Sequence, residues 1–100
     1  MNVADGVEEC YEILYNSTRI ITHSGELVFS PSGIYFFYTN EAEKRIKNPW
    51  SVTYDEIAKY EKTGLFGYLI TLKDGKQLRF SNVFRKLRGH LNEALQKRVR

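Results

Sequence analysis

The stretch that most constrains the fold of this chain covers residues 67–80. Apolar residues lie on both sides of the dipeptide Asp74-Gly75. Asp-Gly between apolar runs is among the strongest short-range signals for a β-hairpin, because the turn needs residues that adopt a positive φ. The stretch therefore predicts two antiparallel strands joined by a tight turn at Asp74-Gly75.

Short apolar segments separated by turn residues precede this hairpin. Aromatic residues make up 14% of the 100 residues, and their side chains suit the pleated surface of a strand. The pattern predicts a frayed helix or turn at residues 4–10, turns at 23–25 and 31–33, and a polar loop or one helical turn at 40–49. The expected strands cover residues 12–16, 26–30, 34–38, 50–54 and 57–62, with extended chain at 18–22.

An amphipathic helix is expected over residues 82–97, where apolar residues recur at spacings of three and four. We expect Ser81 or Asn82 to cap its N-terminus, and Gly89 to let its backbone approach the sheet closely. The members of the apolar stripe are Val83, Phe84, Leu87, Leu91, Ala94 and Leu95.

About seven short strands followed by one helix indicate a mostly β fold, either a small barrel or a pair of packed sheets, capped by the helix. One hundred residues suffice for one domain with its own core. We therefore expect a single domain over residues 1–100, with residues 1–11 as a frayed N-terminal segment.

Five segments carry a resemblance to a known family, namely residues 12–15, 25–30, 33–37, 52–57 and 69–80. Together they resemble the GRAM domain, a member of the pleckstrin-homology-like superfold, in a small stand-alone form of bacterial type. The resemblance covers residues 12–97. It implies a non-enzymatic module that binds phosphoinositides, other anionic lipids, or peptides and proteins. Lipid-binding members usually use the loops between strands one and two and between strands three and four.

Charge is distributed unevenly along the chain. Residues 1–66 carry six Lys or Arg and ten Asp or Glu, a net charge of −4, whereas residues 67–100 carry nine and two, a net charge of +7. Such polarity can steer an acidic partner toward one face, although a solubilising face is an equally simple interpretation. The candidate residues for an anionic ligand are Lys44, Arg45, Lys47, Arg79, Arg85, Lys86 and Arg88.

Leu65 and Phe66 lie between two glycines at a predicted loop tip. If they are exposed, they are candidates for an apolar contact with a membrane or a partner. The alternative is that they fold back and close one end of the sheets.

No catalytic constellation is apparent, and we do not expect an enzyme. His23 and His90 have no Cys or carboxylate cluster at ligand spacing, so we expect no metal and no cofactor. No apolar run approaches the ~20 residues needed to cross a bilayer, and the N-terminus lacks the pattern of a secretory signal. These features favour a cytoplasmic protein, and an anionic lipid partner would place it peripherally at the membrane.

A protein or an anionic lipid is the expected partner. Specific nucleic-acid binding is not expected, because an RNA-recognition motif interleaves helices with strands and this chain places its one long helix last. A homodimer, or a structural domain without a small ligand, stays an open alternative, since the third strand is apolar on both faces.

Overall fold

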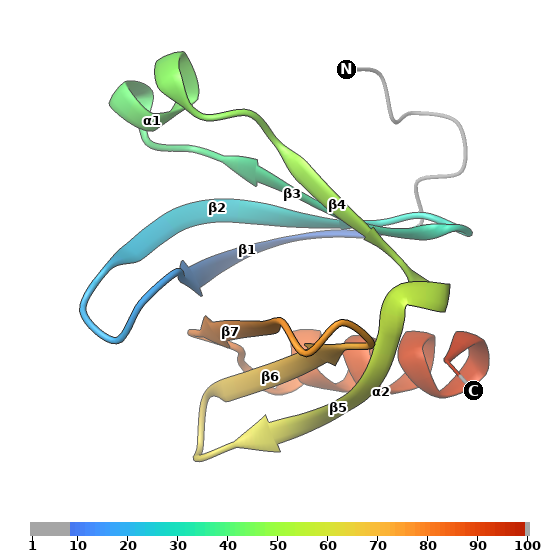
Figure 1. Ribbon diagram of the computed structural model, residues 1–100. Coiled ribbons are helices and arrows are strands. Elements are labelled where there is room, and N and C mark those ends of the chain that lie inside the picture. The colour runs from blue at the N-terminus through green and yellow to red at the C-terminus, as the bar shows by residue number, and fades with distance from the viewer. Residues whose placement is uncertain (1–8, 100) are drawn as a thin grey trace.

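The computed structural model of the protein describes residues 9–99 (Figure 1). In this part of the chain seven strands, two α-helices and one short 3-10 helix follow one another. The elements are β1 (Glu9–Asn16), β2 (Thr22–Phe29), β3 (Gly33–Tyr38), α1 (Glu41–Ile46), β4 (Trp50–Thr53), η1 (Tyr54–Glu56), β5 (Ile57–Thr63), β6 (Gly67–Leu72), β7 (Gln77–Ser81) and α2 (Arg85–Arg98).

All seven strands belong to one antiparallel sheet with the order β4-β3-β2-β1-β7-β6-β5. Figure 1 shows β1 to β4 as one layer and β5 to β7 as a second layer facing it. The layers are joined where the end of β1 pairs with β7, from Leu14 opposite Ser81 to Asn16 opposite Arg79. The predicted fold class, seven antiparallel strands with a C-terminal helix, is confirmed.

The sheet does not close into a barrel. β4 and β5 lie at its two edges, and η1 connects them in sequence. Of the two predicted architectures, the packed layers are therefore correct and the closed barrel is wrong.

The core fills the space between the two layers, because alternate residues of each strand point inward. Phe29, Phe36 and Tyr68 are among its largest fully buried side chains. The Tyr68 hydroxyl donates to Asn92 Oδ1 at 2.7 Å and so fastens α2 to β6. The contribution of α2 to the core consists of Leu87, Leu91, Ala94 and Leu95.

The predicted hairpin forms, with Gly75 at a φ of 94°. Asp74 Oδ1 accepts a hydrogen bond from Lys76 N at 2.9 Å, and Leu72 N donates to Lys76 O at 2.8 Å. The Asp-Gly pair therefore shapes this turn as the sequence indicates.

The start of the final helix differs from the prediction. α2 begins at Arg85, because Asn82 adopts a φ of 63° and Phe84 an extended conformation, neither of which continues a helix. Phe84 occupies the N-cap position and makes no side-chain capping bond, so the prediction that Ser81 or Asn82 caps the helix is wrong. A Cβ at Gly89 would meet open space, so this glycine does not mark a close approach.

Two predictions in the first half of the chain also need correction. The helix or turn predicted at residues 4–10 lies mostly outside the described residues, and Cys10 within it belongs to β1. Residues 23–25 are not a turn. They are part of β2, because the β1–β2 connection falls earlier, between Asn16 and Thr22.

Candidate functional site

One end of the fold gathers the β1–β2 loop and the connection from β3 to β4. Asn16 pairs with Thr22 where β1 turns into β2, and Thr39 N donates to Ser24 O at 3.0 Å where β3 leaves the sheet. The β2–β3 turn lies at the opposite end of these strands, beside the pair Phe29–Ile34. We call the end that holds the β1–β2 loop and the β3–β4 connection the loop end. It lies at the left of Figure 1.

The α1 helix lies at the loop end and carries the first group of predicted cations. Its N-cap, Asn40, accepts hydrogen bonds from Ala42 N and Glu43 N at 3.0 and 3.1 Å. Such a cap stabilises a helix by about 1 kcal/mol, which is a large contribution for a helix of only six residues. None of its residues is buried, and all of them except the partly covered Glu43 are exposed.

His23 links α1 to the β1–β2 loop. Its ring is only 5% exposed and packs between Tyr15 and Tyr38, with ring-centroid distances of 5.7 and 5.6 Å. His23 Nδ1 contacts the Glu43 carboxylate, and Nε2 lies 2.7 Å from Ser17 Oγ. Because an ionised carboxylate only accepts, Nδ1 donates to Glu43, and in the neutral tautomer Nε2 accepts from the Ser17 hydroxyl.

The ring of Tyr15 is stacked on the ring of His23. Burial, with a smaller contribution from Tyr38, raises the pKa of Tyr15 above the ordinary tyrosine value of 10.0. Tyr15 therefore stays neutral beside the imidazole. Both ring nitrogens of His23 are engaged within the protein, so its function is to hold the loop and α1 in one arrangement.

Ser17, His23 and Glu43 are connected in the order of a hydrolytic triad, from hydroxyl to imidazole to carboxylate. Catalysis also needs a place for substrate beside the nucleophile and donors for an oxyanion. Neither of the two cavities described below includes Ser17. We therefore interpret this chain of contacts as a structural support.

Lys44 and Lys47 line a shallow cavity of about 370 Å³ beside α1, whereas Arg45 is not among its lining residues. Phe37 and Tyr38 form an aromatic side of the cavity, and Glu26 is the acidic residue in its lining. Lys44 also lies 3.7 Å from Glu41 in an exposed pair, a contact worth at most about 1 kcal/mol. Lys44 can therefore turn to an external anion at little cost.

Large apolar side chains are exposed among these cations. Ile20, in the β1–β2 loop, is 90% exposed, and Ile46, at the end of α1, is 79% exposed. We define the α1 surface as the exposed isoleucines and the cations of these two segments. Its members are Arg19, Ile20, Ile21, Lys44, Arg45, Ile46 and Lys47.

A second exposed apolar group lies where the β5–β6 turn meets the start of α2. The rings of Phe66 and Phe84 are 5.2 Å apart, and Leu65 is 76% exposed. Val83 N donates to Phe66 O at 2.9 Å, so the turn is fixed to the chain that enters α2. We call Leu65, Phe66 and Phe84 the aromatic turn cluster.

Three of the predicted cations adjoin this cluster, and their position opposes helix stability. Arg85, Lys86 and Arg88 occupy the first turn of α2, which contains no acidic residue. The N-terminus of a helix carries a partial positive charge, so each cation there costs about 0.3–1 kcal/mol. Arg88 Nη1 also reaches Leu65 O at 3.4 Å. These cations are therefore not explained by the stability of α2.

The remaining predicted cation, Arg79, lies elsewhere. It is on β7, paired with Asn16 of β1 on one side and Leu69 of β6 on the other. Its guanidinium donates to Gln77 Oε1 at 3.2 Å. Arg79 is therefore a strand residue, separate in the fold from the first turn of α2.

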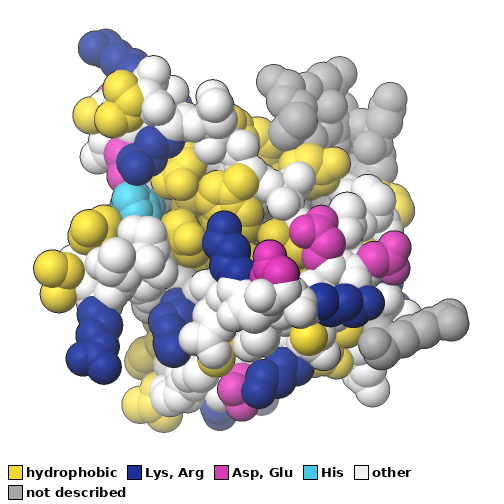
Figure 2. All heavy atoms as spheres, viewed as in Figure 1, with side chains coloured by type: hydrophobic (Ala, Val, Ile, Leu, Met, Phe, Trp, Pro, Cys, Tyr) yellow, Lys and Arg dark blue, Asp and Glu magenta, His cyan; other side chains and the backbone are white. Residues whose placement is uncertain are grey.

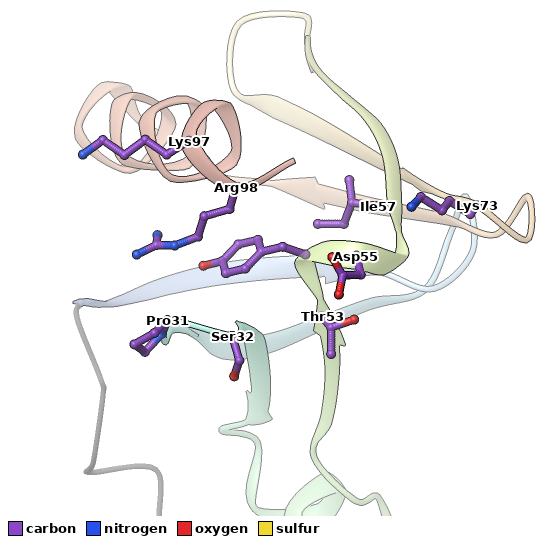
Figure 3. Close-up of a pocket in the computed structure, with 9 residues that line it drawn as sticks. Pro31, Ser32, Thr53, Asp55, Ile57, Lys73, Lys97 and Arg98 are labelled. Carbon is purple, nitrogen blue, oxygen red and sulfur yellow. The ribbon is translucent and has the colours of Figure 1, made fainter. Parts of the chain in front are cut away.

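A larger cavity, of about 550 Å³, lies at the opposite end of the fold, between the β2–β3 turn, η1 and the end of α2. Figure 3 shows Lys73 and Arg98 on opposite sides of Asp55, with the Arg98 side chain extending away from it, while Lys97 points away from the cavity. Lys97 is paired with Glu93 at 3.2 Å, and the Arg98 guanidinium lies 5.2 Å from the centre of the Tyr54 ring.

The charges in this cavity suit the helix better than a ligand. The C-terminus of α2 carries a partial negative charge, which Lys97 and Arg98 offset. Asp55 further opposes an anion here. The cavity therefore has mixed charges, as does the cavity beside α1, where Glu26 accompanies the two lysines.

In the described part of the chain, no helix is long and apolar enough to cross a membrane. Among the same residues, no group of three or more His, Cys, Asp or Glu side chains is placed to hold a metal ion.

No model of a known protein family matches this chain, and no curated protein matches it either. Solved structures do match. The C-terminal domain of an unknown protein from Leishmania infantum superposes with a TM-score of 0.74 at 15% identity, over 90% of this chain and 84% of that chain. The C-terminal PH domain of pleckstrin in complex with D-myo-Ins(1,2,3,4,5)P5 gives 0.69 at 14% identity, over 94% and 99%.

The same pleckstrin domain in complex with D-myo-Ins(1,2,3,5,6)P5 gives a TM-score of 0.69 at 13% identity, over 94% of this chain and 96% of that chain. Together with the observed strand order and C-terminal helix, these likenesses show that the fold is pleckstrin-homology-like.

Sequence reasoning missed the exposed isoleucines and misplaced Phe84. Ile20 and Ile21 were expected in extended chain, with no prediction of their exposure, and Phe84 was expected in the buried stripe of the helix. All three are exposed. The available signal was the polar run of residues 16–18 before Ile20, which is typical of a turn. Leu65 and Phe66, by contrast, are exposed as one of the two alternatives predicted.

Proposed function

We propose that this protein is a non-enzymatic binding module of GRAM type, formed by residues 1–100, that docks on anionic lipid headgroups in the cytoplasm through its α1 surface. The observation that carries the proposal is the exposure of Ile20 and Ile46 among the cations of the loop end. Exposed large apolar side chains beside Lys and Arg are typical of surfaces that lie in the membrane interface.

The energetics favour reversible docking. A basic residue near an anionic membrane surface contributes about 1 kcal/mol, and full burial of an isoleucine contributes about 1.5–3 kcal/mol. Glu41 and Glu43 lie on the same helix as the cations and offset two of the four positive charges of Arg19, Lys44, Arg45 and Lys47. The remaining charge of the α1 surface is positive, which complements phosphate headgroups.

The support of this surface also favours a binding role. The contacts of His23 with Ser17 and Glu43 fix the β1–β2 loop against α1. A binding surface whose loops are already held loses less conformational entropy on docking. The inositol pentakisphosphates in the two pleckstrin complexes support a phosphate headgroup as the ligand class.

Sedimentation with sucrose-loaded vesicles tests the proposal. We expect binding to phosphatidylcholine vesicles that contain phosphatidylserine or a phosphoinositide, weaker binding at higher salt, and little binding to phosphatidylcholine alone. Phosphatidylserine and phosphoinositide vesicles of equal surface charge distinguish general electrostatic docking from headgroup recognition. Equal binding to neutral and anionic vesicles, or no binding to either, would overturn the proposal.

A peptide partner is the second candidate function, and the open sheet favours it. β4 and β5 are edge strands, and an edge strand presents unpaired backbone groups to which a partner strand can be added. Backbone amide exchange separates the two functions, because a peptide protects β4 or β5 whereas a membrane protects the β1–β2 loop and α1.

A further inference from the structure

We propose that the aromatic turn cluster is a second contact with the same anionic bilayer, so that two separate contacts fix the orientation of the protein on the membrane. This inference rests on the proposed function. The apolar residues of the contact are Leu65, Phe66 and Phe84, and its cations are Arg85, Lys86 and Arg88.

The distribution of exposed apolar side chains is the first argument. In the described part of the chain, the exposed large apolar residues fall into only two groups, the isoleucines of the α1 surface and the aromatic turn cluster. Figure 1 shows the β1–β2 loop, α1 and the β5–β6 turn along the same side of the molecule. Figure 2 shows hydrophobic side chains projecting along that side, with Lys and Arg between them.

The second argument is that the cluster is held in its exposed position. The backbone bond from Val83 N to Phe66 O and the ring contact between Phe66 and Phe84 connect the turn to α2. Leu65 accepts a contact from Arg88 through its carbonyl, which leaves its side chain facing outward. Apolar groups that are exposed and fixed at the same time can enter the interface without first ordering the loop.

Charge complementarity is the third argument and selects the occupant. Arg85 and Lys86 directly follow Phe84 in the chain, Arg88 contacts the Leu65 carbonyl, and the first turn of α2 contains no acid to neutralise these cations. Phosphate headgroups supply the missing negative charge while the acyl region receives the apolar side chains. An anionic bilayer therefore fits both components of the cluster.

Two contacts have a geometric consequence that one contact does not have. A single patch leaves the protein free to tilt in every direction about it, whereas two separated patches on one side restrict tilting along the line that joins them. With both patches at the membrane, the β2–β3 turn, η1 and the cavity between Asp55 and Arg98 face away from the bilayer. That end stays available to other proteins.

The test uses an environment-sensitive fluorophore attached through Leu65→Cys in a chain that carries Cys10→Ser, with phosphatidylcholine–phosphatidylserine vesicles. We expect the emission to rise and shift to the blue on vesicle addition, and brominated lipids to quench it. We also expect Leu65→Ser to weaken vesicle binding about tenfold, which corresponds to about 1.4 kcal/mol. Leu65→Met, which keeps the apolar volume, should bind as the original protein does.

The outcomes separate this inference from the proposed function. If the original protein binds anionic vesicles while the fluorophore at position 65 stays in water and Leu65→Ser binds normally, the second contact does not exist and the α1 surface alone docks. If the original protein does not bind these vesicles, both proposals fail. Thermal unfolding of each variant checks that the fold is intact, which the 76% exposure of Leu65 leads us to expect.

Discussion

The double substitution Lys44→Gln and Lys47→Gln should weaken binding to anionic vesicles about 30-fold. The two lysines line the cavity beside α1, and both are exposed. Each basic residue near an anionic surface contributes about 1 kcal/mol, so removing both charges costs about 2 kcal/mol, which is roughly a factor of 30 in the partition coefficient. Glutamine keeps most of the side-chain volume and a good helix propensity, so α1 should persist.

Vesicle sedimentation at about 0.1 M salt measures this loss. The Debye length at this salt concentration is about 10 Å, so only charges close to the membrane surface contribute to binding. The matched control is Lys73→Gln with Lys76→Gln, which removes the same charge from the exposed β6–β7 turn. That turn lies away from the loop end, since Lys73 lines the cavity beside η1. The control should bind within about twofold of the original protein. Equal losses for both pairs would refute the reasoning, because they would show that only the total charge matters.

Further predictions concern the scaffold. Leu91→Ala, at a fully buried position of α2, should lower the free energy of unfolding in urea by about 2–5 kcal/mol, whereas Ile20→Ala should change it by less than about 0.5 kcal/mol; similar losses would contradict the assignment of core and surface. Gly89→Ala should raise it by about 0.5–1 kcal/mol, because a Cβ there meets open space, and a loss would mean that the helix is not as described. Tyr68→Phe should cost about 1 kcal/mol at neutral pH through the lost bond to Asn92. Burial, followed by the nearby Tyr60 hydroxyl, raises the pKa of Tyr68 above 10.0. As the pH rises, the unfolded chain therefore loses the Tyr68 hydroxyl proton before the folded chain does, and the free energy of unfolding falls above about pH 10. Urea titrations should show a smaller fall for the phenylalanine variant, which lacks this hydroxyl.

Local sequence signals predicted the elements that depend on neighbours in the chain. The Asp74-Gly75 turn needs only a residue suited to a positive φ and an adjacent side chain that accepts from the backbone, and both are visible in sequence. Five of the six residues in the predicted stripe, all but Phe84, are buried as expected. The helix start was wrong because the conformations of Asn82 and Phe84 are set by the turn from β7 into α2.

The candidate site depends more on contacts between distant residues. Lys44 and Lys47 could be named from sequence because they lie close together in one polar segment. The support beneath them could not be named, since His23 reaches Glu43 across 20 positions. The exposure of Ile20 likewise depends on where β1 ends and β2 begins, which the register from Asn16 to Thr22 decides.

A comparison of two fluorophore positions tests the central claim, that the loop end faces an anionic bilayer, most directly. In chains that carry Cys10→Ser, one fluorophore is attached through Ile20→Cys in the β1–β2 loop and the other through Ser32→Cys in the β2–β3 turn at the opposite end. With phosphatidylserine-containing vesicles, we predict a blue shift and quenching by brominated lipids at position 20 and an unchanged aqueous signal at position 32. A membrane signal at position 32 with none at position 20 would contradict the account.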